Sequence, residues 1–253
     1  MSLSPPALPK RVDFRVLPDY EAMSVAAANA VLATVRARPN AILCLPTGAS
    51  PERLFELLVL AHQDDPALFR QVRVLKLDEW GGLDMDDPAS CEGYLQTRVI
   101  RPLAISPDRC VSWQSRPNDA RTECARIAAW LERNGPIDVS VLGIGLNGHL
   151  GLNEPGDFLQ PSPHVAALTP ESLEHGMLRT ARRQPEYGLT LGMADLLASR
   201  HVLVLASGAA KAEPLRRLFR REITSQFPAS FLWLHPALTL LCDRAAAAGI
   251  RET

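Results

Sequence analysis

The sequence lacks a strong charge of either sign, and it has no long apolar run. Its formal net charge is −1 over 253 residues, so nothing electrostatic favours nucleic acid or an anionic membrane as a partner. No apolar stretch approaches the roughly 20 residues of a membrane-spanning helix. The first six residues, Met-Ser-Leu-Ser-Pro-Pro, do not have the basic-then-apolar pattern of a secretory signal. We therefore expect a cytoplasmic protein that binds neither nucleic acid nor membranes.

Cysteines are few and irregularly spaced. They number five, which is odd, and no Cys-x-x-Cys pair occurs. This pattern argues against a disulfide framework and against a zinc site, so we expect reduced thiols that mostly pack as small apolar side chains. No bound metal is expected either, because no set of potential ligands has metal-site spacing.

Internal repeats, low-complexity tracts and Pro/Ser-rich linkers are also missing, so nothing marks a domain boundary. Hydrophobic residues make up 47% of the chain, which is enough to bury a sizeable core. We expect residues 1–253 to form a single domain.

What the sequence does contain is an alternation of short apolar runs and helix-like segments. Runs typical of buried strands lie at 12–17, 41–45, 72–77, 139–142, 201–206 and 238–242, and helix-like segments lie at 20–37, 51–61, 91–100, 122–133 and 210–220. This alternation predicts a doubly wound, Rossmann-like α/β fold, in which a mainly parallel sheet carries helices on both faces. Ligands of such sheets bind beyond the carboxyl ends of the strands.

The turn after the second apolar run has the composition of a phosphate-binding loop. Gly48 lets the backbone turn, Thr47 and Ser50 offer hydroxyl groups, and the following helix start offers free N–H groups. A phosphate dianion would be favoured there. Ser50 is also expected to cap a helix that begins at Pro51, and an ordinary capped helix remains the alternative reading.

A second strand-to-helix turn, Ser-Gly-Ala-Ala-Lys at 207–211, places a lysine where it opposes the helix dipole. This position favours a binding role for Lys211, which could reach a phosphate held near the turn. Arg179 and His175, on a helix expected after Pro170, are further candidate substrate contacts. A solvated helix face explains these two equally well.

Two acids, Asp78 and Glu79, directly follow the third apolar run. A carboxylate at the carboxyl end of a strand lies over the ligand crevice of the sheet and could act as a base. The plainer reading is the start of a solvated loop, since adjacent acids are usually exposed. Trp80 could shield a site here or simply pack.

The segment 143–156 contains five glycines together with His149 and Glu154. So many glycines exclude a helix interior or an ordinary strand. The spacing of His149 and Glu154 suits a loop in which the carboxylate holds and polarises the imidazole. A lone loop histidine is usually just solvated, but this combination of residue types favours a functional site.

Taken in order, these segments resemble the glucosamine-6-phosphate deaminase family. The matching motifs are Leu-Pro-Thr-Gly-Ala-Ser-Pro at 45–51, Leu-Asp-Glu-Trp at 77–80, the glycine-rich segment at 143–156, Leu-Thr-Leu-Gly at 189–192 and the turn at 207–211. Asn-Glu-Pro after the histidine separates the chain from the related 6-phosphogluconolactonases. Trp80, residues 147–156 and Ser-Phe-Leu-Trp-Leu-His at 230–235 are similar to the galactosamine-6-phosphate deaminase/isomerase branch.

The resemblance implies a role for each motif. Asp78 looks like the base that moves a proton between C2 and C1 of the opened sugar, and His149, oriented by Glu154, resembles the residue that assists ring opening. The phosphate contacts are then Thr47, Gly48, Ser50 and Lys211. The implied reaction converts galactosamine 6-phosphate to tagatose 6-phosphate and ammonia without a cofactor, and it leaves a homo-oligomer open.

One residue departs from the family pattern. Glucosamine-6-phosphate deaminases carry aspartate where this chain has Asn147. An amide can orient His149 by hydrogen bonding, but it cannot stabilise an imidazolium by charge. The change leaves the choice between the galacto and gluco epimers open. Residues 158–185 are the expected lid over the site, because they follow the catalytic loop and have mixed polarity.

Three other functions remain as alternatives. Glucosamine 6-phosphate could be the substrate, or the same fold could hydrolyse a sugar-phosphate lactone. The third alternative is a non-catalytic sugar-phosphate sensor. Related sensor domains follow a helix-turn-helix segment, whereas the forty residues ahead of the phosphate loop here are typical of one strand and one Ala-rich helix.

Overall fold

The computed structural model describes residues 12–250, and the N-terminal residues that bear on a secretory signal lie outside this range. Seven strands form one sheet in the spatial order β1-β10-β9-β6-β2-β3-β5, and every neighbouring pair is parallel. The strands are β1 (Val12–Leu17), β2 (Ile42–Leu45), β3 (Arg73–Lys76), β5 (Cys110–Val111), β6 (Val139–Gly143), β9 (His201–Ala206) and β10 (Leu238–Asp243). The mainly parallel sheet predicted from the sequence is confirmed.

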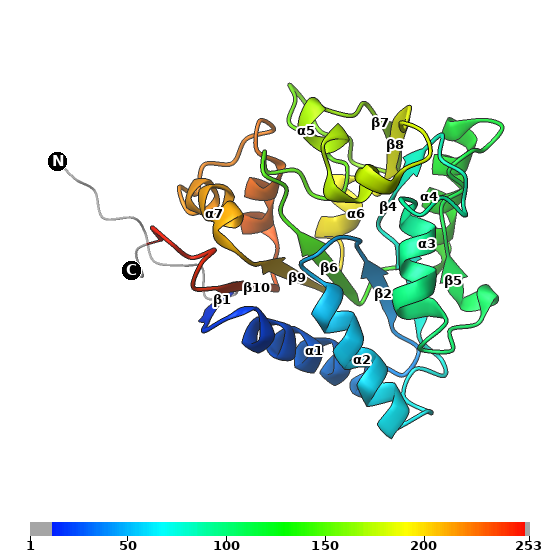
Figure 1. The fold of residues 1–253 in the computed structure, drawn as a ribbon, viewed down its shortest axis with the longest axis horizontal. Coiled ribbons are helices and arrows are strands. Elements are labelled where there is room, and N and C mark those ends of the chain that lie inside the picture. The colour runs from blue at the N-terminus through cyan, green and yellow to red at the C-terminus, as the bar shows by residue number, and fades with distance from the viewer. Residues whose placement is uncertain (1–11, 251–253) are drawn as a thin grey trace.

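The strand order reverses between β2 and β6. From β2 the chain adds β3 and then β5 on one side, and it returns to place β6, β9 and β10 on the other. Figure 1 shows this central part of the sheet above α1 and α2 in the view. A reversal of this kind leaves a crevice beyond the carboxyl ends of the two central strands. The fold therefore creates a ligand site between the loops that follow β2 and β6.

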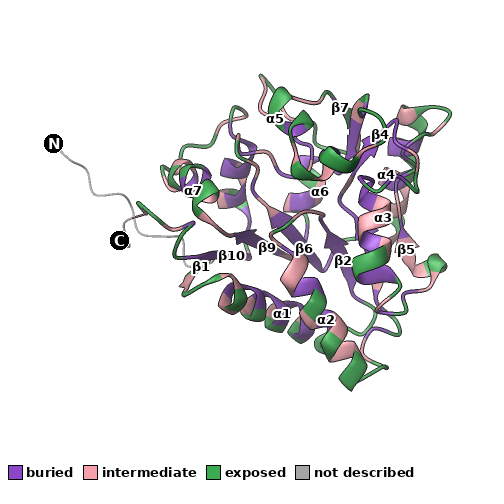
Figure 2. Cartoon of the chain, in the orientation of Figure 1, coloured by how far each residue is buried: buried purple, intermediate pink, exposed green. Residues whose placement is uncertain are grey.

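Helices cover both faces of the sheet because strand side chains alternate between two cores. Leu43 and Leu45 of β2 face the core beneath α1 and α2, whereas Ile42 and Cys44 face the other core. The first core is covered by α1 (Tyr20–Ala37), α2 (Glu52–Asp64), α3 (Cys91–Leu95) and the π-helical turn η1 (Gln96–Ile100), and the second by α4 (Ala120–Asn134), α6 (Met193–Leu197), α7 (Ala212–Leu218) and the 3₁₀ turn η5 (Pro228–Leu234). Figure 2 shows buried strands between helices whose outer surfaces are exposed.

A second sheet of three strands was not predicted. It has the order β4-β8-β7 and is antiparallel, with β4 (Asp78–Gly81), β8 (Tyr187–Thr190) and β7 (His164–Ala166). The solvated-loop reading of the two acids is therefore wrong, because they open β4 and Glu79 is fully buried. This small sheet packs above the carboxyl ends of the main strands and carries the first acid to the crevice.

Three expected helix features also differ from the structure. Ser50 does not cap α2, which begins at Glu52 after Pro51 and has no side-chain cap. The helix expected after Pro170 divides into α5 (Pro170–Leu173) and a 3₁₀ turn, η3 (Gly176–Thr180). The helix expected at 210–220 is a 3₁₀ turn, η4 (Ala209–Lys211), followed by α7. In each case a short turn replaces regular helix beside the crevice.

The cysteines and the helices agree with a packed α/β core. All five cysteines are free, and four of them are buried. Within residues 12–250 no helix combines the length and the apolar character needed to cross a membrane. A short 3₁₀ turn, η2 (Pro107–Arg109), completes the described elements.

Candidate active site

A cavity of about 390 Å³ lies beyond the carboxyl ends of the central strands. Its walls come from the turn after β2, the start of β4, the glycine-rich segment after β6, and the turn η4 after β9. Residues 171–176 close one side. Segments far apart in the chain therefore meet where the strand order reverses, as expected for this kind of sheet.

The two predicted phosphate-binding turns lie on the same cavity. Thr47, Gly48 and Ser50 line it from the turn after β2, and Gly48 adopts a φ of +104°, which a side chain would oppose. Lys211 lines it from η4, and its Nζ donates a hydrogen bond to the carbonyl oxygen of Ile144 at 2.7 Å. Burial lowers the pKa of Lys211. An anion in the cavity would offer this ammonium a stronger partner than a carbonyl.

His149 and Glu154 meet as the spacing predicted. His149 Nδ1 lies 3.4 Å from Glu154 Oε2, and the ring reaches over Gly145, where an added Cβ would lie 2.4 Å from ring atoms. Burial opposes ionisation of Glu154, but bonds from His149, Ser172 and Asn147 outweigh it and lower its pKa. The anionic carboxylate thus fixes the imidazole from its Nδ1 side.

Asn147 acts on this pair differently from the expectation. Its amide nitrogen donates to Glu154 Oε2 at 2.9 Å, and its amide oxygen accepts from the backbone N–H of His149 at 3.0 Å. The amide therefore orients the carboxylate and the loop backbone instead of contacting the imidazole. A carboxylate here could not donate to Glu154, so asparagine suits the position chemically.

Asp78 lies at the first position of β4 and faces the same cavity. Burial and, after it, the charge of Glu79 raise the pKa of Asp78 to about 7, although His149 and Lys76 act in the opposite direction. A carboxyl that titrates near neutrality can both accept and return a proton, which is what a general base in an isomerisation must do.

Two residues of the 171–176 segment belong to the site but were missed or left open. Ser172 donates from Oγ to Glu154 Oε1, and this Oγ lies 3.4 Å from His149 Nδ1. His175 lines the cavity near Gly48, with a pKa lowered first by burial and then by the charges of His149 and Lys211. A serine gives no sequence signal by itself, because its role depends on a loop that folds back over the cavity.

Of the remaining predicted residues, Trp80 lines the cavity and packs, whereas Arg179 does neither. The indole of Trp80 is 4% exposed and lies 5.9 Å from the ring of His175. Arg179 is exposed on η3 and is not among the lining residues. The cavity is therefore lined by every predicted site residue except three. Asn147 and Glu154 lie behind His149 and support it, and Arg179 lies outside the site.

The fold and this geometry place the chain in the class of parallel α/β proteins with a cavity at the topological switch point, here lined by a carboxyl, an imidazole and an ammonium group. The family described as glucosamine-6-phosphate isomerases/6-phosphogluconolactonase matches residues 19–240. The chain therefore belongs to this family, which confirms the resemblance of its motifs.

Individual relatives agree with this assignment. The chain is 41% identical over 217 residues to the proposed deaminase AgaI of Escherichia coli (strain K12), covering 86% of each chain. It is 35% identical over 230 residues to glucosamine-6-phosphate deaminase 1 of Bacillus subtilis (strain 168), covering 90% of this chain and 95% of that one.

Solved structures share the fold. A monomeric glucosamine-6-phosphate deaminase of the NagB superfamily superposes with a TM-score of 0.89 at 34% identity, covering 93% of this chain and 99% of that chain. The 6-phosphogluconolactonase of Leishmania guyanensis gives a TM-score of 0.75 at 22% identity, covering 95% and 99%. The second likeness shows the fold alone.

Proposed function

We propose that the protein isomerises and deaminates a hexosamine 6-phosphate, with galactosamine 6-phosphate as its substrate and tagatose 6-phosphate and ammonia as its products. One observation carries the proposal above the others. Asp78, with a pKa of about 7, faces the same cavity as the imidazole of the His149–Glu154 pair. Membership of the glucosamine-6-phosphate isomerase/6-phosphogluconolactonase family is compatible with this chemistry, and 35% identity to a glucosamine-6-phosphate deaminase supports it.

Ring opening is the task that suits His149. Opening the pyranose requires a proton to leave O1 and another to reach O5. Because Glu154 occupies the Nδ1 side, the Nε2 side of the ring is the one available to the sugar. The serine and amide bonds to Glu154 keep that carboxylate in place during the transfer.

Proton transfer along the opened sugar is the task of Asp78. The carboxylate removes the proton from C2 of the 2-amino aldehyde, giving an enolamine, and returns it to C1. Carbon C2 then becomes an imine, water adds to it, and the C2–N bond breaks to release ammonia. Substrate and water together balance the ketose phosphate and ammonia, so the sequence needs no oxidant or reductant.

The phosphate would lie between the turn at 47–50 and Lys211. Hydroxyls, backbone N–H groups and an ammonium at this end of the cavity match a dianion. Binding energy gained there holds C1 and C2 beside Asp78 without contacting the reacting carbons.

The choice of the galacto epimer rests on the branch motifs, namely Trp80, residues 147–156 and residues 230–235. The structure adds that Trp80 and His175 form one wall of the cavity and that Asn147 supports Glu154 from behind. We therefore expect the contacts that distinguish the two epimers to come from this wall.

The test incubates the purified protein with each epimer separately and measures both ammonia and ketose phosphate. Galactosamine 6-phosphate is expected to be the better substrate by kcat/KM, and Asp78→Asn serves as the inactive control. Preference for the gluco epimer would overturn the substrate assignment but keep the reaction. Release of ammonia from neither epimer would overturn the proposed reaction itself.

A further inference from the structure

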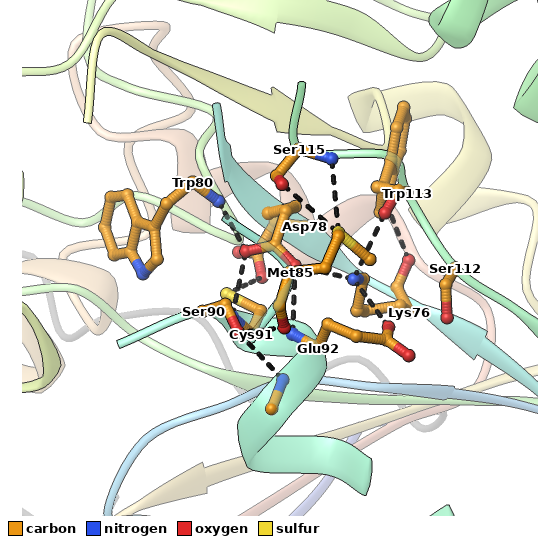
Figure 3. A network of polar contacts seen from close by, with 12 residues as sticks. Lys76, Asp78, Trp80, Met85, Ser90, Cys91, Glu92, Ser112, Trp113 and Ser115 are labelled. Atoms are coloured by element: carbon orange, nitrogen blue, oxygen red, sulfur yellow. Dashed lines mark hydrogen bonds and ion pairs between the residues drawn. The ribbon is translucent and has the colours of Figure 1, made fainter. Parts of the chain in front are cut away.

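The two adjacent acids at the start of β4 have opposite surroundings. Glu79 accepts four hydrogen bonds: Oε1 from the backbone N–H groups of Trp80 and Cys91, and Oε2 from the backbone N–H of Glu92 and the ammonium of Lys76. Figure 3 shows the polar contacts that surround Lys76, Trp80 and Cys91 in this region. Every acceptor position that a buried carboxylate needs is therefore filled.

Lys76 is the cation of this network. Its side chain is only 1% exposed, and its Nζ lies 2.6 Å from Glu79 Oε2 and 2.9 Å from Glu92 Oε2. The carbonyl oxygen of Trp113 lies 3.5 Å from the same nitrogen. An ammonium buried this deeply is costly unless it is paired, so its presence calls for a specific reason.

Asp78 receives none of these donors. Within residues 12–250 its carboxyl has one hydrogen-bond contact, the thiol of Cys91 at 3.9 Å. The two N–H groups at the start of α3, which could have stabilised this carboxylate, are both bonded to Glu79. The titratable groups that face Asp78 are Lys76, Glu79, Cys44, Cys91 and His149.

We propose that Lys76 is a positioning residue for Asp78. By pairing with Glu79, it keeps this carboxylate on the amides of α3 and adds a positive charge near the neighbouring base. Lys76 is the last residue of β3 and Glu79 is the second residue of β4. Their ion pair therefore links the two strands across the short segment that contains Asp78. This inference deepens the proposed function, because it concerns the same base.

The charges give the proposal a sign. Lys76 favours the ionised form of Asp78 and Glu79 opposes it. Removing the cation in Lys76→Met is expected to raise the pKa of Asp78 by about one unit, and removing the anion in Glu79→Gln to lower it by about one unit. The double variant restores the local balance, so its Asp78 should titrate near the wild-type position.

The primary measurement is the titration of Asp78 itself. Carboxyl-13C aspartate is incorporated into the full-length protein, the Asp78 signal is assigned from Asp78→Asn, and its NMR shift is followed from pH 4 to 9. Opposite displacements in Lys76→Met and Glu79→Gln would support the proposal. Displacements in the same direction, or none in either variant, would overturn it.

This titration needs no substrate, so it separates the proposal from the proposed function. If the displacements are opposite but no hexosamine phosphate is consumed, the reaction is wrong and the role of Lys76 stands. If the substrate is consumed, the acid limb of kcat/KM should move with the titration, and Lys76→Met should lose about fivefold at pH 7. A limb that stays fixed while the protein turns over would overturn the role of Lys76.

Controls distinguish positioning from folding. Glu92→Gln removes a carboxylate that contacts the same ammonium but is 15% exposed, and it should displace the Asp78 titration by much less than Glu79→Gln does. Lys76→Arg keeps the charge, so the titration of Asp78 in this variant should stay near its wild-type position. If Lys76→Met does not fold, comparison of Glu79→Gln with Glu92→Gln still decides the proposal, since equal displacements would contradict it.

Discussion

One carboxylate lies at the amino edge of the main sheet and another beyond its carboxyl edge, and their surroundings differ. At the amino edge, Asp138 accepts the backbone N–H of Ile42 at 2.9 Å and pairs with Arg38 and Arg200 at 3.2 and 3.3 Å. At the carboxyl edge, the only hydrogen-bond partner that the described residues give Asp78 is the thiol of Cys91 at 3.9 Å. One acid is satisfied by its surroundings, and the other is left with capacity to react.

A cavity or cleft lies at each edge of the sheet, so its presence alone does not identify the candidate active site. The cleft at the amino edge holds about 160 Å³ and is lined by Arg38, Arg73 and Arg200 as well as Asp138. Helices α1 and α4 both end there, and arginines near helix C-termini complement the helix dipole. Its charges serve the fold, whereas those of the carboxyl-edge cavity remain available to a ligand.

The largest expected effect that tests this contrast comes from Asp78→Asn. Loss of the base should lower kcat on the hexosamine phosphate by about a thousandfold. Stability should change in the opposite direction. The folded pKa of Asp78, about 7, lies above its ordinary value of 3.8, so the folded state loses stability as the pH rises through this interval. At pH 8 the asparagine variant should be more stable by up to about 4 kcal/mol.

Urea denaturation at pH 8 and at pH 4 measures this second effect. The stabilisation should be present at pH 8 and absent at pH 4, where the wild-type carboxyl is protonated in the folded state. An Asp78→Asn protein that is less stable at both pH values would mean that the carboxyl is structural, like Asp138, and the contrast would fail.

The next largest effect is expected for Lys211→Met. Removal of a charge-assisted bond to phosphate should raise KM by about 10- to 100-fold, with a smaller change in kcat. Arg179→Met is the matched control, because Arg179 is exposed and does not line the cavity. Equal rises in KM for the two variants would show that the phosphate contacts η3 and that the assignment of the binding turn is wrong.

Features of the structure that depend on residues close together in the chain could be predicted from the sequence. The strands β1 and β9 and the helix α1 have the predicted bounds, because an apolar run or a periodic helix face depends on neighbouring residues. The turns at 47–50 and 207–211 and the pair His149–Glu154 were predicted for the same reason. Strand ends in a parallel sheet bring such turns together whatever the details of packing.

The second sheet and the burial of Glu79 could not be predicted in this way. Strands β4, β7 and β8 are three or four residues long, and β4 begins with two acids, so no local pattern distinguishes them from loops. Glu79 can be buried only because Lys76 and the amides of α3 meet it in space. Ser172 likewise depends on residues 171–176 folding over the cavity. Motion of residues 158–185 as a lid remains a prediction.

A smaller effect is expected at Gly145, where the absence of a side chain makes room for the imidazole ring of His149. A Cβ at position 145 would lie 2.4 Å from atoms of the His149 ring, whereas a Cβ at Gly143 would meet no atom within 4 Å. Gly145→Ala should therefore displace the imidazole and lower kcat by about tenfold or more, since catalysis is sensitive to misplacement of about 1 Å. Gly143→Ala should keep wild-type kcat. Similar activity in both variants would show that the ring has another position available.

The smallest kinetic effect is expected at the amino edge. In Asp138→Asn the side chain keeps its size and can still accept the Ile42 N–H, but it loses the charge that pairs with Arg38 and Arg200. The free energy of unfolding should fall by about 1–2 kcal/mol, because the arginines are about half exposed and water screens part of the loss. The kcat and KM of the folded protein should stay at wild-type values. A changed KM without loss of stability would instead reveal that the amino-edge cleft communicates with the cavity, and the division of the sheet into a structural and a reactive edge would have to be abandoned.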